Sequence, residues 1–284
     1  MRFVNIQREN YAEPGLLVDD TFLGLRGAGF HDLLSVIHRG SEATDAVNRW
    51  IENHPFSEES EADKTTLAAP IPRPPKIICV GLNYRDHAAE AGLSIPEVPT
   101  IFAKFPTAVL GPHQPIVLPK ASRRPDYEAE LCVVIGKGGR HIPAEKWREH
   151  VFGYTIFNDV SARDFQTATS QWMIWKTFDT FAPFGPAIVT ADEIADPHNL
   201  RISLELNGQL MQDSNTSNLI FKIPQLIEHL SSVFTLETGD LIATGTPAGV
   251  GFARKPPVYL RPGDEVRVRI EGLGELVNPV VAEG

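Results

Sequence analysis

Short apolar segments alternate with polar turns along the first part of this 284-residue chain. The pattern predicts short strands at Phe3–Ile6, Leu16–Val18 and Thr21–Leu25. It then predicts helical stretches at Leu33–Val36 and Ala43–Glu52. We therefore expect a small N-terminal α+β domain, in which no motif indicates a particular chemistry.

A change in composition divides the chain near residues 55–75. Residues 57–64 include four acidic residues and are expected to be solvated, whereas residues 70–75 include four prolines. A proline-rich segment of this kind favours an extended, polyproline-like linker. The division predicts two domains, at residues 1–70 and 71–284.

Strand-like segments dominate the chain after this linker, and glycine and proline turns separate them. One clear helix is predicted at Ile223–Phe234, and a strand is predicted at Leu241–Thr244. Many short strands with turn signals between them favour a rolled or barrel-like β core.

Two glutamates one residue apart lie inside an apolar run at Tyr127–Gly136. Side chains alternate between faces along a strand, so Glu128 and Glu130 point to the same side, about 6.5–7 Å apart along the chain. Like charges repel, and a buried carboxylate without a partner is unfavourable. A hard divalent cation would offset both effects. The alternative is a strand whose polar face meets water, which would leave both glutamates solvated.

A second apolar strand, within Tyr154–Asp164, ends in a polar cluster that contains Asp159. A third carboxylate at a strand end favours a cation site made of oxygen ligands. Lys176 follows within an aromatic run at residues 172–180. Most such lysines extend along their alkyl chains to the surface. Beside carboxylates and a metal ion, Lys176 could instead orient a ligand or stabilise a developing negative charge.

A histidine and a glutamate form a second chemical group. Asn83 is a suitable N-cap, so Tyr84–Ala91 is predicted as a short helix. His87 and Glu90, three residues apart, would be neighbours on one face of it. A carboxylate beside an imidazole fixes its tautomer and raises its basicity, which suits a general base. The alternative is a surface pair, worth only about 0.2–0.5 kcal/mol.

Composition and charge exclude several classes of partner. The net charge of −10 argues against nucleic acid and anionic membranes. No apolar run reaches transmembrane length, and the first eight residues lack the apolar core of a signal peptide. Cys79 and Cys132 lie in apolar segments, which favours buried thiols and a reducing, cytoplasmic location. The nine histidines show no zinc-ligand spacing, and no G-x-S-x-G motif offers a covalent nucleophile.

Five segments of the chain, taken in order, resemble a known family. They are Lys76–His87, Asp126–Gly136, Asn158–Gln166, Lys176–Pro186 and Gly239–Gly251. Together they resemble the fumarylacetoacetate hydrolase (FAH) superfamily over nearly all of residues 73–284. The likeness is greatest to the small bacterial and FAHD-type members, which cleave acylpyruvates and sugar-derived 2,4-dioxo acids. It implies an α+β fold, in which an FAH-type mixed β-roll catalytic domain follows the small N-terminal domain, and it implies a homodimer.

The resemblance also implies a metal site and a catalytic group. The implied ligands of Mg²⁺ or Mn²⁺, with Ca²⁺ as a third choice, are Glu128, Glu130 and Asp159. Lys176 is implied as a catalytic and substrate-contacting lysine, and His87 with Glu90 as the pair that activates water. Fumarylacetoacetases carry a further acidic ligand where this chain offers only Asn83 or Tyr84. Three protein carboxylates are therefore expected.

Two further segments are implied as substrate contacts. Arg163 and Gln166 lie in an S-A-R-D-x-Q segment that resembles the substrate-contacting segment of the family. From the sequence alone, Arg163 could equally be a structural ion-pair partner. The G-T-P-x-G-V-G stretch at residues 245–251 lines the pocket in the family, which implies contacts from Gly245 and the Thr246 hydroxyl. An ordinary glycine-rich turn is the alternative.

These residues lead to an expected reaction. A metal-dependent hydrolase would cleave the C–C bond of a 2,4-dioxo acid, an acylpyruvate or a 2,4-diketo-3-deoxy sugar acid, and release pyruvate and a carboxylic acid. One alternative is a decarboxylase or lyase of oxaloacetate or a related 2-oxo acid, which needs the same metal ion but no activated water. A second alternative is a non-enzymatic protein with a structural ion.

Overall fold

The structure, a computed structural model, describes residues 1–18, 21–53 and 66–284. The acidic stretch predicted at residues 57–64 lies outside the described residues. Strands outnumber helices in the described part, and the strands form three sheets. The expected α+β class is therefore confirmed.

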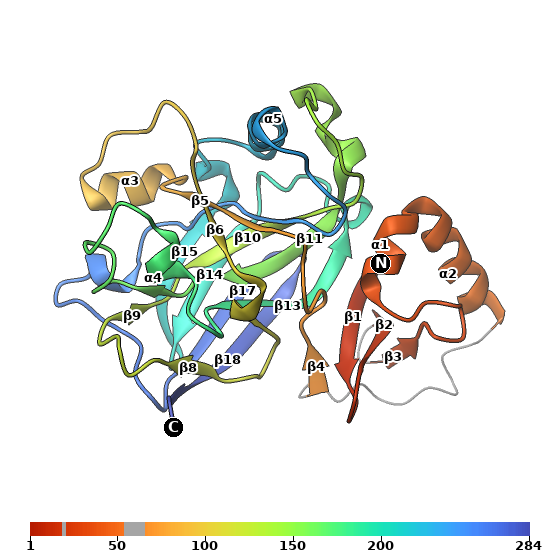
Figure 1. Cartoon of the computed structure of the whole chain (residues 1–284), viewed down its shortest axis with the longest axis horizontal. Helices are drawn as coiled ribbons and strands as arrows, with labels where there is room; N and C mark the ends of the chain where they lie inside the picture. Colours follow the sequence, from red (N-terminus) through yellow and green to blue (C-terminus); the bar gives the residue numbers. More distant parts are fainter. Residues whose placement is uncertain (19–20, 54–65) are drawn as a thin grey trace.

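The largest sheet has 11 strands and extends from the N-terminal part into the centre of the molecule (Figure 1). Its strand order is β3-β2-β1-β13-β11-β10-β16-β5-β6, with β4 beside β1 and β7 beside β13. The bounds of these strands are Arg2–Gln7 (β1), Ala12–Val18 (β2), Thr21–Gly24 (β3), Leu67–Ala68 (β4), Ile77–Gly81 (β5), Thr100–Lys104 (β6), Val109–Leu110 (β7), Ala129–Ile135 (β10), Val151–Asn158 (β11), Ala182–Thr190 (β13) and Leu241–Ala243 (β16).

Two smaller sheets complete the strand-rich body. One has five strands in the order β15-β14-β17-β18-β8, and the other pairs β12 with β9. The bounds are Ile116–Leu118 (β8), Pro125–Asp126 (β9), Ser161–Ala162 (β12), Arg201–Leu206 (β14), Gln209–Asn215 (β15), Glu265–Ile270 (β17) and Gly274–Ala282 (β18).

Five α-helices lie outside the sheets in the described part of the chain. They are Leu33–Arg39 (α1), Ser41–Asn53 (α2), Arg85–Ala91 (α3), Met173–Lys176 (α4) and Ile223–Val233 (α5). The helices predicted from the sequence within α1, α2, α3 and α5 are confirmed. The predicted N-cap of α3 is wrong. Tyr84 occupies the cap position, while the Asn83 side chain binds backbone groups of Phe221 and Thr244.

The N-terminal strands are continuous with the central sheet. β1 pairs with β13 through Arg2↔Val189 and Phe3↔Ile188. A separate apolar cluster, which includes Phe3 and Leu33, packs α1 and α2 against these strands. The division at residue 70 thus falls within a continuous sheet, and two domains remain a proposal.

The strands β10 and β11 position the acidic residues. All seven residues of β10 are buried, because β11 and β16 flank it and apolar clusters cover both faces. Glu128 precedes β10 and Asp159 follows β11, and the Asp159 N–H donates to the Glu128 C=O at 2.9 Å. The Glu128 N–H donates to Asn158 Oδ1 at 3.0 Å. Antiparallel pairing therefore brings residues about thirty positions apart into contact.

Candidate functional site

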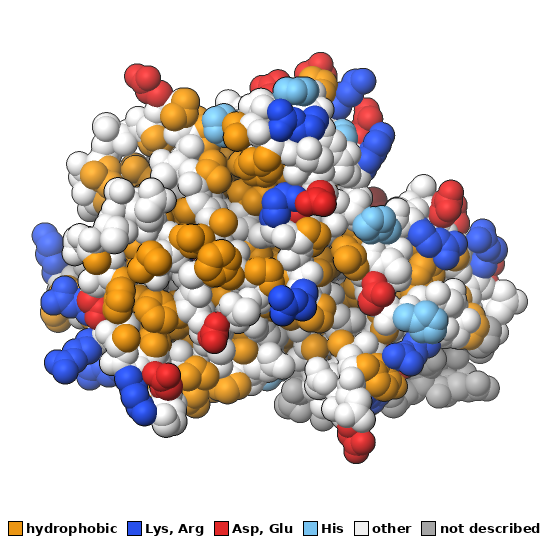
Figure 2. All heavy atoms as spheres, in the orientation of Figure 1, with side chains coloured by type: hydrophobic (Ala, Val, Ile, Leu, Met, Phe, Trp, Pro, Cys, Tyr) orange, Lys and Arg blue, Asp and Glu red, His pale blue; other side chains and the backbone are white. Residues whose placement is uncertain are grey.

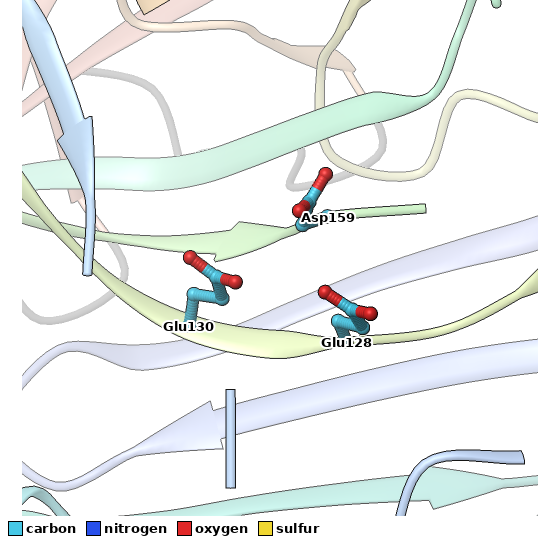
Figure 3. Close-up of side chains that lie close together, drawn as sticks. All are labelled: Glu128, Glu130 and Asp159. Carbon is cyan, nitrogen blue, oxygen red and sulfur yellow. The ribbon is translucent and has the colours of Figure 1, made fainter. Parts of the chain in front are cut away.

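Three buried carboxylates meet where β10 and β11 pair (Figure 3). Oxygen atoms of Glu128, Glu130 and Asp159 lie within 4.8 Å of one another. The exposed fractions of these residues are 5%, 1% and 0%. The predicted convergence of the three carboxylates is confirmed, and the alternative of solvated glutamates is wrong.

Lys176 bridges two of the three carboxylates. Its ammonium donates to Glu128 Oε2 at 2.7 Å and to Asp159 Oδ2 at 2.5 Å. Burial alone would raise the pKa of Glu128, but the charges of Lys176 and Arg163 lower that pKa to about 2. Burial also opposes the charge of Lys176, yet the two carboxylates raise the pKa of its ammonium. The surface-lysine alternative is thereby excluded, since Lys176 is 2% exposed.

Glu130 differs from the other two carboxylates. Its Oε2 accepts a hydrogen bond of 2.8 Å from the Gly245 N–H, a neutral donor. Burial and the neighbouring charges of Asp159 and Glu128 raise the pKa of Glu130 well above its ordinary value. Glu130 is thus the carboxylate with the weakest compensation of its charge.

A second lysine, Lys104 at the end of β6, contacts Asp159 from another side. Its side chain is 0% exposed and donates to Asp159 Oδ1 and to the Val160 C=O, the latter at 3.0 Å. Burial lowers the pKa of Lys104, and the Asp159 charge offsets part of that effect. The sequence interpretation missed Lys104, because a lysine that ends a strand is normally solvated. The apolar residues Ile101 and Phe102 just before it were the one available signal.

Arg163 is held by carboxylates rather than left free. Its Nε donates to Asp126 Oδ2 at 2.9 Å and its Nη2 to Glu128 Oε1 at 2.5 Å. The guanidinium also lies over the Phe252 ring, 4.4 Å from its centroid. Asp126, which was not assigned a function from the sequence, further accepts from the Gly251 N–H at 2.8 Å. The structural ion-pair alternative for Arg163 is confirmed, and a substrate contact remains a proposal.

The charges of the cluster leave room for a cation. In the described part of the chain, four buried carboxylates face three buried cations: Asp126, Glu128, Glu130 and Asp159 against Lys104, Arg163 and Lys176. With all four carboxylates ionised, one negative charge would be uncompensated; among these four, Glu130 is the one that forms no ion pair with the three cations. An all-carboxylate donor set suits a hard divalent cation. The residues present thus fit a divalent metal ion.

His87 and Glu90 form the predicted pair on α3. His87 Nδ1 lies 3.4 Å from Glu90 Oε2. The Glu90 carboxylate also accepts from the Gly249 N–H at 3.0 and 3.1 Å. Burial would raise the pKa of Glu90, but the hydrogen bonds from His87 and Gly249 lower it. The start of α3 is anchored to β15, because the Ser214 hydroxyl donates to Asp86 Oδ2 at 2.5 Å.

One cavity of about 170 Å³ connects these groups. Its polar lining contains most of the predicted site residues: His87, Glu128, Glu130, Asp159, Arg163, Gln166, Lys176 and Thr246. Its apolar lining includes Leu93, Phe102, Trp172, Trp175 and Phe252. The structure therefore brings an acid–base group, a carboxylate cluster and a lysine to one small enclosed space.

Three predicted residues lie behind the cavity rather than on its wall. Gly245 uses its N–H to hold Glu130, and Glu90 lies behind His87. The Asn83 amide is fully engaged with backbone groups. Among the described residues, the cluster of possible metal ligands consists of Glu128, Glu130 and Asp159. Three protein carboxylates as metal ligands remain a proposal.

The chain matches a known family and named relatives. Residues 76–281 match the family described as fumarylacetoacetate (FAA) hydrolase C-terminal. The mitochondrial oxaloacetate tautomerase FAHD2B of Bos taurus is 44% identical over 99% of this chain and 92% of its own. The mitochondrial oxaloacetate tautomerase FAHD2A of Homo sapiens is 50% identical over 77% of this chain and 70% of its own.

A solved structure shares the fold. The crystal structure of maleylpyruvate hydrolase from Sphingobium sp. SYK-6, in complex with manganese(II) ion and pyruvate, has a TM-score of 0.83. It is 31% identical, and the match covers 100% of both chains. The expected FAH-type fold is therefore confirmed. In the described ranges, no helix of this chain is long and apolar enough to span a membrane.

The relatives overturn two expectations. The predicted C–C bond hydrolysis is wrong, because the curated relatives are oxaloacetate tautomerases. Hydrolysis, decarboxylation and tautomerisation all use an enolate, so residues that stabilise an enolate could not distinguish them. The alternative that named oxaloacetate is nearer to these relatives. The predicted cytoplasmic location is also contradicted, since both relatives are mitochondrial; two buried thiols do not identify a compartment.

Proposed function

This chain belongs to the fumarylacetoacetate hydrolase family, and we propose that it is an oxaloacetate tautomerase that uses a divalent metal ion. The observation that carries the proposal is that His87 faces the same cavity as Lys176 and the carboxylate cluster. Tautomerisation requires a base that moves one proton and a cationic environment that stabilises an enolate. These residues can supply both requirements without an attacking water.

His87 is the proposed proton carrier. In keto oxaloacetate the mobile proton lies on C3, beside the C2 carbonyl. Glu90 accepts at Nδ1, which leaves Nε2 of His87 to take the C3 proton. The electron pair of the C–H bond forms the C2–C3 double bond, and negative charge moves to the C2 oxygen. Return of the proton to that oxygen gives the enol, and no carbon–carbon bond breaks.

The cation and Lys176 share the stabilisation of that charge. Glu128, Glu130 and Asp159 would hold the ion, and a bound ion supplies Lewis-acid stabilisation to the C2 oxygen. We propose Mg²⁺, with Mn²⁺ as its substitute, because three carboxylates form a hard-oxygen donor set. Lys176 holds Glu128 and Asp159 in position and adds positive charge at the same wall.

The cavity also suits a small dicarboxylic acid. Its volume of about 170 Å³ is below the roughly 300 Å³ that begins the usual range for drug-sized ligands. Arg163, Gln166 and Thr246 line it beyond the carboxylate cluster. We propose that the second carboxylate of oxaloacetate lies near Arg163, whose guanidinium keeps one edge free of the contacts to Asp126 and Glu128.

A homodimer remains part of the proposal. Figure 2 shows hydrophobic side chains gathered on the face that carries α3 and α4. Exposed apolar residues include Val98 between α3 and β6, Phe105 directly after β6, and Ile174 of α4, which are 64%, 50% and 49% exposed. An extended apolar surface of this kind favours association with another chain. Light scattering of the wild type and of Ile174→Asp would test whether this face joins two copies.

The reaction is tested by following the two tautomers directly. Enol oxaloacetic acid is dissolved, and the loss of its ultraviolet absorbance is followed with metal alone, with protein and Mg²⁺, and with protein and chelator. We expect protein with Mg²⁺ to exceed metal alone by at least about a hundred-fold, as general acid–base catalysis permits. A coupled lactate dehydrogenase assay reports any pyruvate formed.

Two outcomes would contradict the proposal in different ways. Loss of the enol at the rate of metal alone would exclude tautomerase activity. Rapid pyruvate formation without faster enol loss would indicate decarboxylation at the same site.

A further inference from the structure

The backbone of Gly249 is held at both its N–H and its C=O. Its N–H donates to the Glu90 carboxylate at 3.0 and 3.1 Å. Its C=O accepts from the Tyr127 hydroxyl and from Arg254 Nε, each at 3.3 Å. The same residue therefore connects Glu90 on α3 with Tyr127 and Arg254 in the body of the protein.

Arg254 holds this peptide against β15. While its Nε donates to the Gly249 C=O, its Nη2 donates to the Met211 C=O of β15. A Cβ on Gly249 would lie 2.1 Å from the Met211 oxygen, and Gly249 has φ +101°, so only glycine fits this close approach. The planar fork of an arginine can bridge two carbonyls, whereas a lysine presents a single point charge.

Arg254 is not explained by charge pairing. In the part of the chain that the structure describes, its hydrogen-bond partners are the two carbonyls and the Tyr127 hydroxyl, and it forms no ion pair with a carboxylate. Its charge nevertheless contributes, after His87 and Gly249, to lowering the pKa of Glu90. Its geometry and its charge thus both favour an ionised Glu90 beside His87.

We propose that Arg254 is a positioning residue for the His87–Glu90 pair. By holding the Gly249 C=O, Arg254 restricts the backbone of this glycine and so directs the Gly249 N–H at Glu90. Glu90 then selects the His87 tautomer with a proton on Nδ1. Tyr127, which directly precedes Glu128 in the chain, donates to the same carbonyl. The inference deepens the proposed function, on which its kinetic part rests.

The test compares two arginines with the same kind of contact. Arg254→Met removes the bridge, and Arg140→Met is the matched control, because Arg140 donates to the Val233 and Ser232 carbonyls at 2.7 and 3.3 Å away from the cavity. The first readout is the nitrogen NMR spectrum of the His87 ring in protein with Mg²⁺, assigned with His87→Ala. It reports the tautomer and does not depend on turnover.

We expect one His87 tautomer in the wild type and in Arg140→Met, a mixture in Arg254→Met, and a smaller change in Arg254→Lys. For oxaloacetate we expect kcat to fall about ten- to a hundred-fold in Arg254→Met with KM within about two-fold, the effect of a misplaced base. In a Glu90→Gln background, Arg254→Met should lower kcat no further.

An unchanged His87 tautomer in a folded Arg254→Met protein would overturn the inference. The inference would also be overturned if Arg254→Met lost as much stability as Arg140→Met while the His87 tautomer stayed unchanged. If the wild type does not tautomerise oxaloacetate, the proposed function fails, while the NMR comparison still decides whether Arg254 positions the pair.

Discussion

The carboxylate cluster and the His87–Glu90 pair face one cavity, yet the protein holds them in opposite ways. Glu130 lies on the central strand β10, Glu128 directly precedes that strand, and Asp159 directly follows its partner β11; all three are at most 5% exposed. The pair lies on the seven-residue α3, where the two side chains are 11% and 25% exposed. Hydrogen bonds between strands thus hold the carboxylate cluster in position, whereas side-chain contacts hold the His87–Glu90 pair in position. The two should therefore respond independently to substitution.

The largest effect is expected from the carboxylate cluster. Glu130→Gln removes a ligand and the least compensated charge, so divalent-cation affinity should fall by more than about a hundred-fold, and activity should fall with it. Titration of Mn²⁺ followed by electron paramagnetic resonance measures the affinity. Unchanged Mn²⁺ binding would mean that the cation lies elsewhere. Glu205→Gln is the control, because Glu205 is a partly exposed residue of β14 that pairs with Arg269 outside the carboxylate cluster.

His87→Ala should impair proton transfer and leave the cation site intact. Removal of the base is expected to lower kcat for oxaloacetate by about 10²- to 10⁴-fold, while Mn²⁺ affinity stays within about two-fold of the wild type. Steady-state kinetics and the same titration measure the two quantities. If metal affinity falls in parallel with kcat, the two halves are not independent.

Lys104→Met tests how much a buried cation beside Asp159 contributes to the free energy of unfolding. The variant leaves the buried Asp159 with one cation fewer, so the free energy of unfolding should fall by about 3 kcal/mol without metal. Saturating Mg²⁺ should restore part of that loss, because the ion replaces the missing charge. Urea denaturation with and without Mg²⁺ measures both.

The exposed pair Arg201–Asp213 supplies the control for Lys104. Arg201→Met should leave the free energy of unfolding nearly unchanged, because the pair is exposed to solvent, and Mg²⁺ should not alter the difference. An equally small change in Lys104→Met would show that Lys104 is dispensable for folding.

The smallest effect is a pH dependence at Glu90. Its pKa in the folded protein lies below the ordinary value of 4.5, so the ionised form stabilises the fold above that pH. This contribution is lost as the pH falls through the lower, folded pKa. The stability difference between wild type and Glu90→Gln should therefore be greatest above about pH 5 and should narrow below 4.5. Urea denaturation midpoints across this pH range measure the stability difference. In a His87→Ala background, that difference should depend less on pH.

The sequence predicted the parts of the site that follow from local pattern. Alternation along a strand placed Glu128 and Glu130 on one side, and the end of the next strand supplied Asp159. The bounds predicted for α5 differ from the structure by one residue. These features depend on neighbours in the chain, which the pattern of apolar and polar residues records.

The features that the sequence did not predict depend on distant contacts. Lys104 reaches Asp159 only because β6 and β11 lie in one folded sheet. Asparagine is a common N-cap residue, but the Asn83 amide instead forms hydrogen bonds with backbone groups of Thr244 and Phe221. The choice between an activated water and a moved proton depends on the substrate, which no residue pattern in the chain specifies.

The register of β10 against β11 has a consequence for divergence of this protein. A one-residue slip would turn Glu130 to the opposite face and separate it from Asp159, so selection must preserve both strands together. The α3 segment carries no such constraint, because it joins the site through a few side chains and the Gly249 peptide. After gene duplication, a descendant could therefore acquire a different proton-transfer chemistry by mutations in α3 alone while it inherits the cation site intact.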